Sequence, residues 1–192
     1  MKKIVTTGLI ACTLLIGFGC NQKPEPVEEA QEANEQAFED TPMEETKDDL
    51  SEFMTEAASG GMMEVELGRM AEQKAQHADV KSFGQMMVTD HTKANDELKA
   101  LAASKNIMLP DSMGRDHMDH VAELRDKTGA DFDKAYMKLM VEDHQEDIDE
   151  FEEAARDLQD ADAKAFASKT LPVLQKHHER AKQIKDMLDK QK

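Results

Sequence analysis

The 192-residue sequence predicts an all-α protein, and three observations support this fold class. From Asp48 onward, apolar residues recur at spacings of three and four, the period of an amphipathic helix. No segment shows the β-branched alternation typical of a strand. Two short sequence repeats also mark what we expect to be two helical hairpins. The part of the chain after Asp48 is long enough to form one sizeable domain.

Residues 1–19 are typical of a lipoprotein signal peptide. Lys2 and Lys3 form a basic start, and residues 4–18 are an uncharged apolar run, too short to span a bilayer. The run ends in a small residue followed by Cys20, as a lipoprotein peptidase requires. We therefore expect cleavage before Cys20 and lipidation of its thiol. Ordinary cleavage nearby, which would leave Cys20 free, is the alternative.

Lipidation of Cys20 would place the protein in the cell envelope. No later stretch is apolar enough to span a membrane, so we expect a chain that is tethered by lipid and not inserted. Asn21 follows the cysteine, and under the enterobacterial sorting rule this favours the outer membrane, facing the periplasm or the cell surface.

Residues 20–47 are expected to form a lipidated, disordered acidic linker. Nine acidic residues oppose only Lys23 and Lys47 before Asp48, and three prolines are interspersed with few large apolar residues. Such a composition cannot bury a core, and its charges repel one another. A short helix over Ala30 to Phe38 is compatible with the pattern.

Residues 48–190 are predicted to form the helical domain. Gly129 is expected to stop the third helix, and Pro172 to kink the fifth. The Gly60-Gly61 pair is expected either to bend the first helix or to let a neighbour approach closely. The five predicted helices cover residues 48–76, 79–104, 112–127, 131–158 and 161–190.

The repeats indicate how these helices connect. Residues 78–83 match residues 161–166, and each segment starts the second helix of a hairpin; residues 87–91 similarly match residues 140–144. The connection between the two hairpins is much longer than an adjacent antiparallel turn needs. It can cross the bundle with the short third helix inside it. The prediction is therefore a ferritin-like antiparallel four-helix bundle with a short extra helix in the crossover.

Four polar residues lie on the predicted buried stripes, one on each long helix: Glu64, His91, His144 and His177. Glu64 and His91 each lie about 20 Å from the first hairpin turn, and the other two each lie about 25 Å from the second. If the two turns lie at opposite ends, all four side chains meet near the middle of the bundle.

A carboxylate and three imidazoles can bind a divalent metal ion such as zinc, iron or copper. Asp90, Asp143 and Asp147 are then expected to accept hydrogen bonds from the rings and to orient them. The alternative is a hydrogen-bonded polar layer that fixes helix register without any metal.

Four segments of the sequence together resemble the bacterial domain-of-unknown-function 4142 family. They are residues 57–75, 80–102, 132–155 and 164–178, the last of which reads KAFASKTLPVLQKHH. Members are described as exported or outer-membrane proteins with a ferritin-like bundle. The resemblance covers about residues 48 to 188 and implies the same fold and location, together with the motif positions Glu64, His91, His144 and His177. It implies no activity.

Several function classes are disfavoured. The formal net charge of −17 repels nucleic acid, so we expect no nucleic-acid partner. Di-iron sites of ferritin-like proteins use Glu-x-x-His motifs, but His91 and His144 are preceded at that spacing by Val88 and Val141, which leaves too few carboxylates to bridge two irons. No phosphate loop or nucleophile elbow is present, so the pattern leans away from an enzyme.

Two interpretations remain for the protein as a whole. The first is an envelope module that binds a divalent metal, with copper handling by methionines and by His117 and His120 as a variant of it. The second is a metal-free structural lipoprotein that binds an envelope protein partner.

Overall fold

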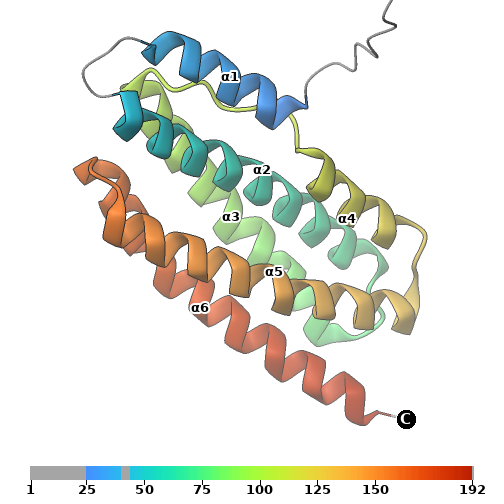
Figure 1. Ribbon diagram of the computed structural model, residues 1–192. Coiled ribbons are helices and arrows are strands. Elements are labelled where there is room, and N and C mark those ends of the chain that lie inside the picture. The colour runs from blue at the N-terminus through green and yellow to red at the C-terminus, as the bar shows by residue number, and fades with distance from the viewer. Residues whose placement is uncertain (1–24, 40–43, 192) are drawn as a thin grey trace, which may run out of the picture.

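The computed structural model describes residues 25–39 and 44–191, and Cys20 with the predicted signal peptide lies outside them. The described residues form six α-helices and no strand (Figure 1). None of these helices is long and apolar enough to cross a membrane. The prediction of an all-α fold is confirmed, and the five predicted helices correspond to α2 through α6 with small shifts at their ends. The helices are α1 (Pro26–Phe38), α2 (Glu44–Lys74), α3 (Ala78–Lys105), α4 (Arg115–Arg125), α5 (Gly129–Asp157) and α6 (Ala161–Lys190).

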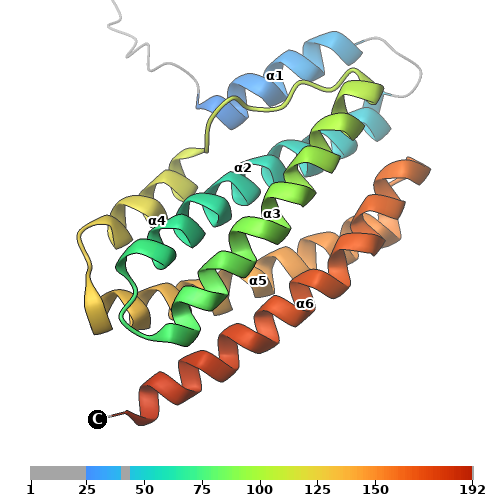
Figure 2. The ribbon, with the colours of Figure 1, turned by 180° about the vertical axis from the view of Figure 1, so that it is seen from behind.

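The four long helices form two hairpins whose turns lie at opposite ends of the bundle (Figures 1 and 2). At one end, the Asp133 carboxylate near the start of α5 accepts hydrogen bonds from the amides of Gln76 and His77 in the α2–α3 turn. At the other end, Lys105 at the end of α3 pairs with Asp160 and Asp162 beside the α5–α6 turn. Helix α2 packs on α3 and α5, and α6 packs on α5 and α3. Because the two hairpin turns lie at opposite ends, each of these pairs of neighbouring helices is antiparallel.

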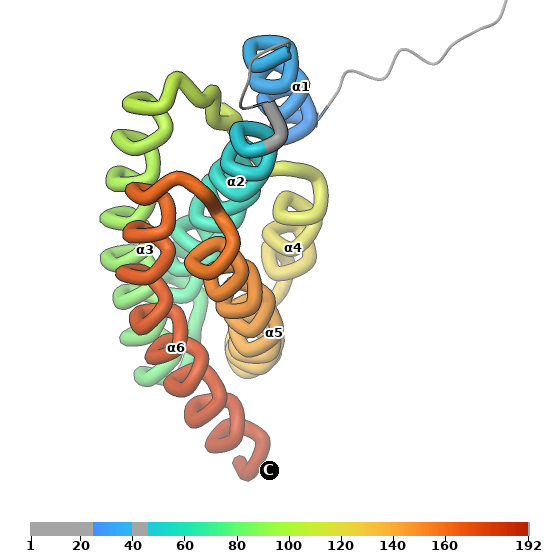
Figure 3. Tube along the Cα trace, turned by 60° about the vertical axis from the view of Figure 1, so that its left-hand side comes forward, coloured from blue at the N-terminus to red at the C-terminus, as the bar shows by residue number. Residues whose placement is uncertain are grey.

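The crossover between the hairpins carries α4, which lies outside the four long helices and beside α2 and α5 (Figure 3). Helix α3 ends at Asn106, whose φ of 59° is the left-handed conformation that asparagine tolerates. Helix α4 ends at Arg125, and Gly129, with φ also 59°, is the first residue of α5. The glycine thus follows the end of α4, as expected, and begins the next helix.

The expectation of disorder over the whole acidic linker was wrong for residues 26–38, which form α1. This helix lies along α2 and buries Val27, Ala30 and Phe38. Its Asn34 amide is also buried, donating to the carbonyl of Met108 at 2.9 Å and accepting from the Met108 amide at 2.7 Å. The prediction of disorder rested on the overall composition of this segment, which does not show that its apolar residues recur at spacings of three and four. That single apolar stripe is enough to pack one face of the helix.

Two glycines set the spacing of α2 and α3. A Cβ on Gly84 would lie 2.7 Å from the Cβ of Ala71 and 2.7 Å from the carbonyl oxygen of Gly68, so the helices touch backbone to backbone there. In the Gly60-Gly61 pair, only Gly61 allows a close approach of α3. A Cβ added at this position would overlap the side-chain amide of Asn95. Pro172 lies inside α6, which continues as one helix from Ala161 to Lys190.

Buried apolar side chains form two clusters with a polar layer between them. The cluster nearer the α2–α3 turn includes Phe83, Tyr136 and Ile184, and the other includes Phe151 and Phe166. The predicted metal ligands lie between these clusters along each long helix.

Candidate metal centre

Glu64, His91, His144 and His177 come together in the polar layer, one from each long helix. Their exposed fractions are 3%, 5%, 0% and 0%, so all four side chains are removed from water. The structure therefore shows the convergence expected from the sequence spacing. Buried imidazoles and carboxylates are costly unless each finds a partner, so the contacts of these groups decide their chemistry.

The three histidines form what we call the imidazole group. One nitrogen from each ring lies within 4.8 Å of the others, and the ring centroids are 5.3 to 5.6 Å apart. Burial lowers the pKa of His91 and of His177 to about 4, and that of His144 well below its usual value. All three rings are therefore neutral at pH 7, which is the form that binds a metal ion.

A chain of hydrogen bonds runs through two of these rings. His177 Nε2 lies 2.9 Å from Asp90 Oδ2, His177 Nδ1 lies 3.3 Å from His91 Nε2, and His91 Nδ1 lies 2.5 Å from Glu64 Oε2. With neutral rings, Asp90 accepts from His177, His177 accepts from His91, and His91 must then accept from Glu64. Glu64 thus carries a proton, in agreement with a pKa that burial and the charge of Asp143 raise well above the usual value.

His144 stands outside this chain. Its Nε2 lies 3.4 Å from Glu64 Oε1 and its Nδ1 lies 3.9 Å from Asp143 Oδ2, but neither contact has the geometry of a hydrogen bond. The Met140 carbonyl one turn earlier favours the protonated ring, yet burial and the neighbouring histidines outweigh it. The Met140 carbonyl lies near the ring, but no contact of either nitrogen has the geometry of a hydrogen bond, so His144 is a wholly buried imidazole without a full partner.

A second cluster, here called the carboxylate group, consists of Glu64, Asp143, His144 and Asp147, whose ligand atoms also lie within 4.8 Å of one another. Of the three aspartates expected to orient the rings, Asp90 contacts a ring, that of His177. Asp143 and Asp147 make no hydrogen bond to a ring among the described residues, and each has one buried oxygen without a partner. Asp147 instead lies beside Glu64, with ligand atoms of the two carboxylates within 4.8 Å of each other.

The carboxylates of this group disfavour one another's ionisation. Burial is the main cause of their raised pKa values: it raises the pKa of Asp143 to about 7 and that of Asp147 well above its usual value. The charges of Glu64 and Asp143 raise the pKa of Asp147 further. The sequence pattern predicted only a ring-orienting role for Asp143 and Asp147, whereas the structure places both beside Glu64 and His144.

Two further residues belong to the centre and were not predicted. Asn95, one turn after His91, lines a cavity of about 20 Å³ together with Glu64, His91 and Asp147, which is room for one water-sized particle. The Tyr136 hydroxyl is buried without a partner, and burial and the charges of Glu64 and Asp143 raise its pKa. Their spacing from the histidines, four residues and eight, is the signal that could have identified them.

The histidines of α4 have a different setting. His117 Nδ1 lies 2.6 Å from the hydroxyl of Ser59, which also accepts from the Gly114 amide at 2.9 Å. Among the described residues, no third histidine, cysteine or carboxylate joins His117 and His120 in a metal-binding group. The structure therefore adds no support to a copper site on this helix.

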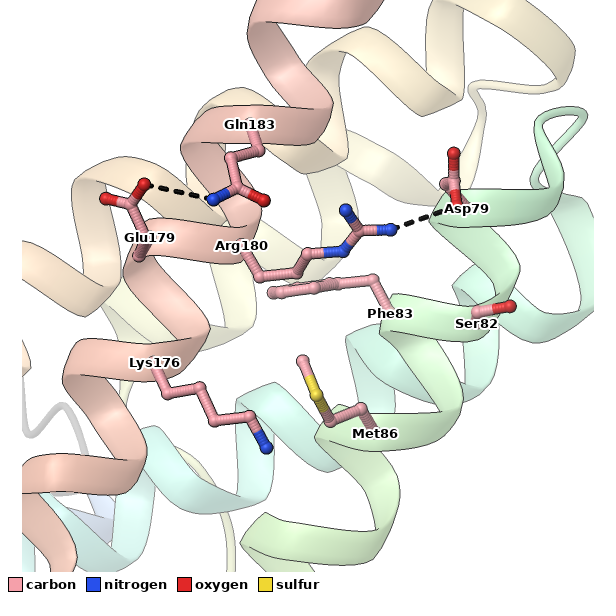
Figure 4. Close-up of a pocket in the computed structure, with 8 residues that line it drawn as sticks. All are labelled: Asp79, Ser82, Phe83, Met86, Lys176, Glu179, Arg180 and Gln183. Carbon is pink, nitrogen blue, oxygen red and sulfur yellow. Dashed lines mark hydrogen bonds and ion pairs between the residues drawn. The ribbon is translucent and has the colours of Figure 1, made fainter.

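On the α3–α6 side, the centre is closed by Phe83, whose ring packs against His177 with centroids 6.4 Å apart. Outside it lies a surface pocket of about 420 Å³, where Arg180 pairs with Asp79 across the two helices (Figure 4). Lys176 extends into the same pocket. This face is thus apolar at its base, and its rim carries two basic and two acidic side chains, Lys176, Arg180, Asp79 and Glu179.

The DUF4142 family, described as a domain of unknown function, matches residues 33–184 of the sequence. No curated protein and no solved structure matches the chain. The matched region includes the second half of α1, from residue 33, and all the residues of both groups, and it confirms the resemblance seen in the sequence. The chain therefore belongs to the DUF4142 family.

Proposed function

We propose that this chain is a lipid-anchored protein of the cell envelope whose helical bundle binds a divalent metal ion at the imidazole group. Zinc, iron and copper are the candidates, because all three accept imidazole ligands. Glu64, beside His91, would provide a carboxylate oxygen as a further ligand.

The observation that carries this proposal is the state of His144. Its ring is fully buried, its nitrogens lack hydrogen-bond partners, and it faces two other neutral imidazoles from different helices. A bound cation would supply the missing partner for His144. It would also replace the proton of Glu64, because a positive charge favours the carboxylate.

The surrounding architecture is compatible with a ferritin-like bundle, which carries metal sites between facing helices. Two antiparallel hairpins joined by a long crossover form the domain, and the ligands come from the interior face of each long helix. The anchor rests on Cys20 and its signal-peptide context, and residues 21–25 alone separate Cys20 from α1, which packs on the bundle. We expect the outer membrane to be the site of attachment.

Metal analysis of the purified full-length chain tests the proposal. The protein should retain metal after incubation with zinc and removal of free ions, and the variant carrying His91→Ala and His144→Ala should retain none at the centre. His178→Ala is the matched control, because His178 adjoins His177 on α6 but belongs to neither group. Absence of metal in the wild-type protein after incubation with zinc, iron and copper would contradict the proposal.

The second candidate function is a metal-free lipoprotein that binds an envelope protein partner. The continuous chain from Asp90 through His177 and His91 to Glu64 favours it, because those groups satisfy one another without a metal. This function predicts a wild-type protein that folds normally and stays free of metal in the same experiment.

The anchor has a separate test. Cells grown with radiolabelled palmitate should label the wild-type protein and not the Cys20→Ala variant, and the wild-type protein should sediment with membranes. Equal labelling of both proteins, or of neither, would refute lipidation at Cys20.

A further inference from the structure

The negative charges of the carboxylate group are not balanced by basic side chains among the described residues. Glu64, Asp143 and Asp147 converge within 4.8 Å, and none of them is paired with a lysine or arginine among the described residues. Three carboxylates at this distance in a buried site cannot all be ionised unless a cation joins them. Protons or a metal ion must therefore neutralise them.

Unpaired atoms in this group point to a ligand. Glu64 Oε1, Asp143 Oδ2, Asp147 Oδ2 and both nitrogens of His144 are buried without hydrogen-bond partners. Buried polar atoms of native proteins are normally paired, so several orphaned atoms of one cluster mark a place where a partner binds. The side chains of Glu64 and His144 are 4% and 0% exposed, and both are rigidly placed on long helices.

We propose that the centre holds two divalent cations side by side, the first at the imidazole group and the second among Glu64, Asp143 and Asp147. This inference rests on the proposed metal-binding function. Glu64 is placed to bridge the two positions, since its Oε2 faces His91 and its Oε1 faces His144. Bridging carboxylates are a recurrent feature of two-metal sites, whose ions lie roughly 3.5–4 Å apart.

The ligand chemistry distinguishes the two positions. The second offers mainly carboxylate oxygens, which suit harder cations such as manganese or iron(II). The first offers nitrogen ligands, which suit zinc and copper as well.

The second position is also the one closest to solvent. Asp143 lines a surface pocket of about 470 Å³ between α1, α2, α4 and α5, together with Glu28, Glu56, Asp116 and Glu146. A cleft lined by one sign of charge concentrates counter-ions, so this pocket would draw cations towards Asp143. On the opposite face, outside Phe83, two basic side chains are balanced by Asp79 and Glu179, so that pocket offers no comparable concentration of negative charge (Figure 4). We expect ions to enter through the acidic pocket.

Manganese loading of the full-length chain tests the second position. The wild-type protein should bind two equivalents of manganese(II) and show an exchange-coupled EPR spectrum, because the ions are adjacent. The variant with Asp143→Asn and Asp147→Asn should bind one equivalent and show the six-line signal of an isolated ion. The variant with Glu142→Gln and Asp149→Asn, which removes two exposed carboxylates from the same helix, should behave like the wild type.

The outcomes separate this inference from the proposed function. One ion in the wild type, lost with His91→Ala and His144→Ala but kept in the Asp143 and Asp147 variant, would refute the second position and leave the first. Two ions without exchange coupling would refute their adjacency, and this readout needs no variant to fold. No bound metal of any kind would overturn both proposals.

Discussion

Replacing His144 with leucine separates a metal ligand from a structural polar residue, because the two roles predict opposite changes in stability. The ring is fully buried, and no contact of its two nitrogens has the geometry of a hydrogen bond. Below it on α5, Met140 and Tyr136 belong to the apolar cluster, so a leucine of similar size would extend that cluster.

The size of the effect follows from the unpaired nitrogens. An unsatisfied buried polar group costs about 1–3 kcal/mol in protein mutational data. Removal of the imidazole should therefore raise the free energy of unfolding of the metal-free protein by about 1–3 kcal/mol. Zinc at a hundred times its dissociation constant should stabilise the wild-type protein by about 2.7 kcal/mol, and the variant by much less.

Urea denaturation at pH 7, followed by circular dichroism with EDTA and then with zinc, measures both quantities. The His178→Leu variant is the control, and its response to zinc should equal that of the wild type. A His144→Leu variant that is less stable than the wild type in EDTA by more than about 1 kcal/mol would refute the reasoning. That result would mean that His144 has a structural partner in the metal-free protein.

The same denaturation assay tests three further predictions. Gly84→Ala should lower the free energy of unfolding by about 1–3 kcal/mol, because the new Cβ meets atoms of α2 at 2.7 Å, whereas Gly60→Ala, with contacts of 3.8 Å or more, should raise it by up to about 1 kcal/mol. Equal effects of the two substitutions would contradict the close approach of α2 and α3. Asn34→Ala should cost about 2 kcal/mol, because it leaves the amide and carbonyl of Met108 without their partners, and an unchanged stability would show that α1 does not pack as described. Burial and neighbouring carboxylates raise the pKa of Glu150 from 4.5 to about 7, so the folded state holds a proton that the unfolded state releases, and stability in EDTA should fall as the pH rises from 4.5 to 7. Glu150→Gln should remove on the order of 2–3 kcal/mol of this fall, and a pH profile identical to the wild type would refute the assignment.

The helical periodicity was sufficient to predict the five helices after residue 47, because each has a continuous apolar stripe and a recognisable end. The residues of α1 were predicted to belong to a disordered linker, because acidic residues and prolines dominate the composition of this segment. The four residues of α1 that are buried are too few to change that composition. Whether so short a stripe is buried depends on the partner surface of α2 and of the crossover, which periodicity does not reveal.

The repeated Asp-His pairs show what local sequence leaves undetermined at the site. Asp90-His91 and Asp143-His144 share the local pattern Met-Val-x-Asp-His. Yet the side chain of Asp90 is 36% exposed and bonds to His177, while that of Asp143 is 12% exposed and lacks such a bond. The difference arises from the outer layer, because α1 and α4 cover the α2–α5 side of the bundle. The sequence spacing therefore places Glu64, His91, His144 and His177 at one level, as the structure has them, but the contacts of each aspartate depend on tertiary packing.

The carboxylate-lined grooves give the metal proposal its physical context. A second surface pocket between α2 and α5 is lined by Glu52, Glu56, Glu150 and Glu153, so acidic side chains continue along this face beyond the pocket at Asp143. Together with the formal net charge of −17, this arrangement favours cations over anionic ligands at the entrance.

The central claim is that a divalent metal ion binds between His91, His144 and His177, and anomalous diffraction from crystals grown with zinc locates such an ion directly. Data collected on both sides of the zinc absorption edge should show a difference peak within about 2.0–2.1 Å of one nitrogen from each ring. A structure in which the three imidazoles hydrogen-bond only to one another, to carboxylates or to water, with zinc peaks confined to the surface, would contradict the account.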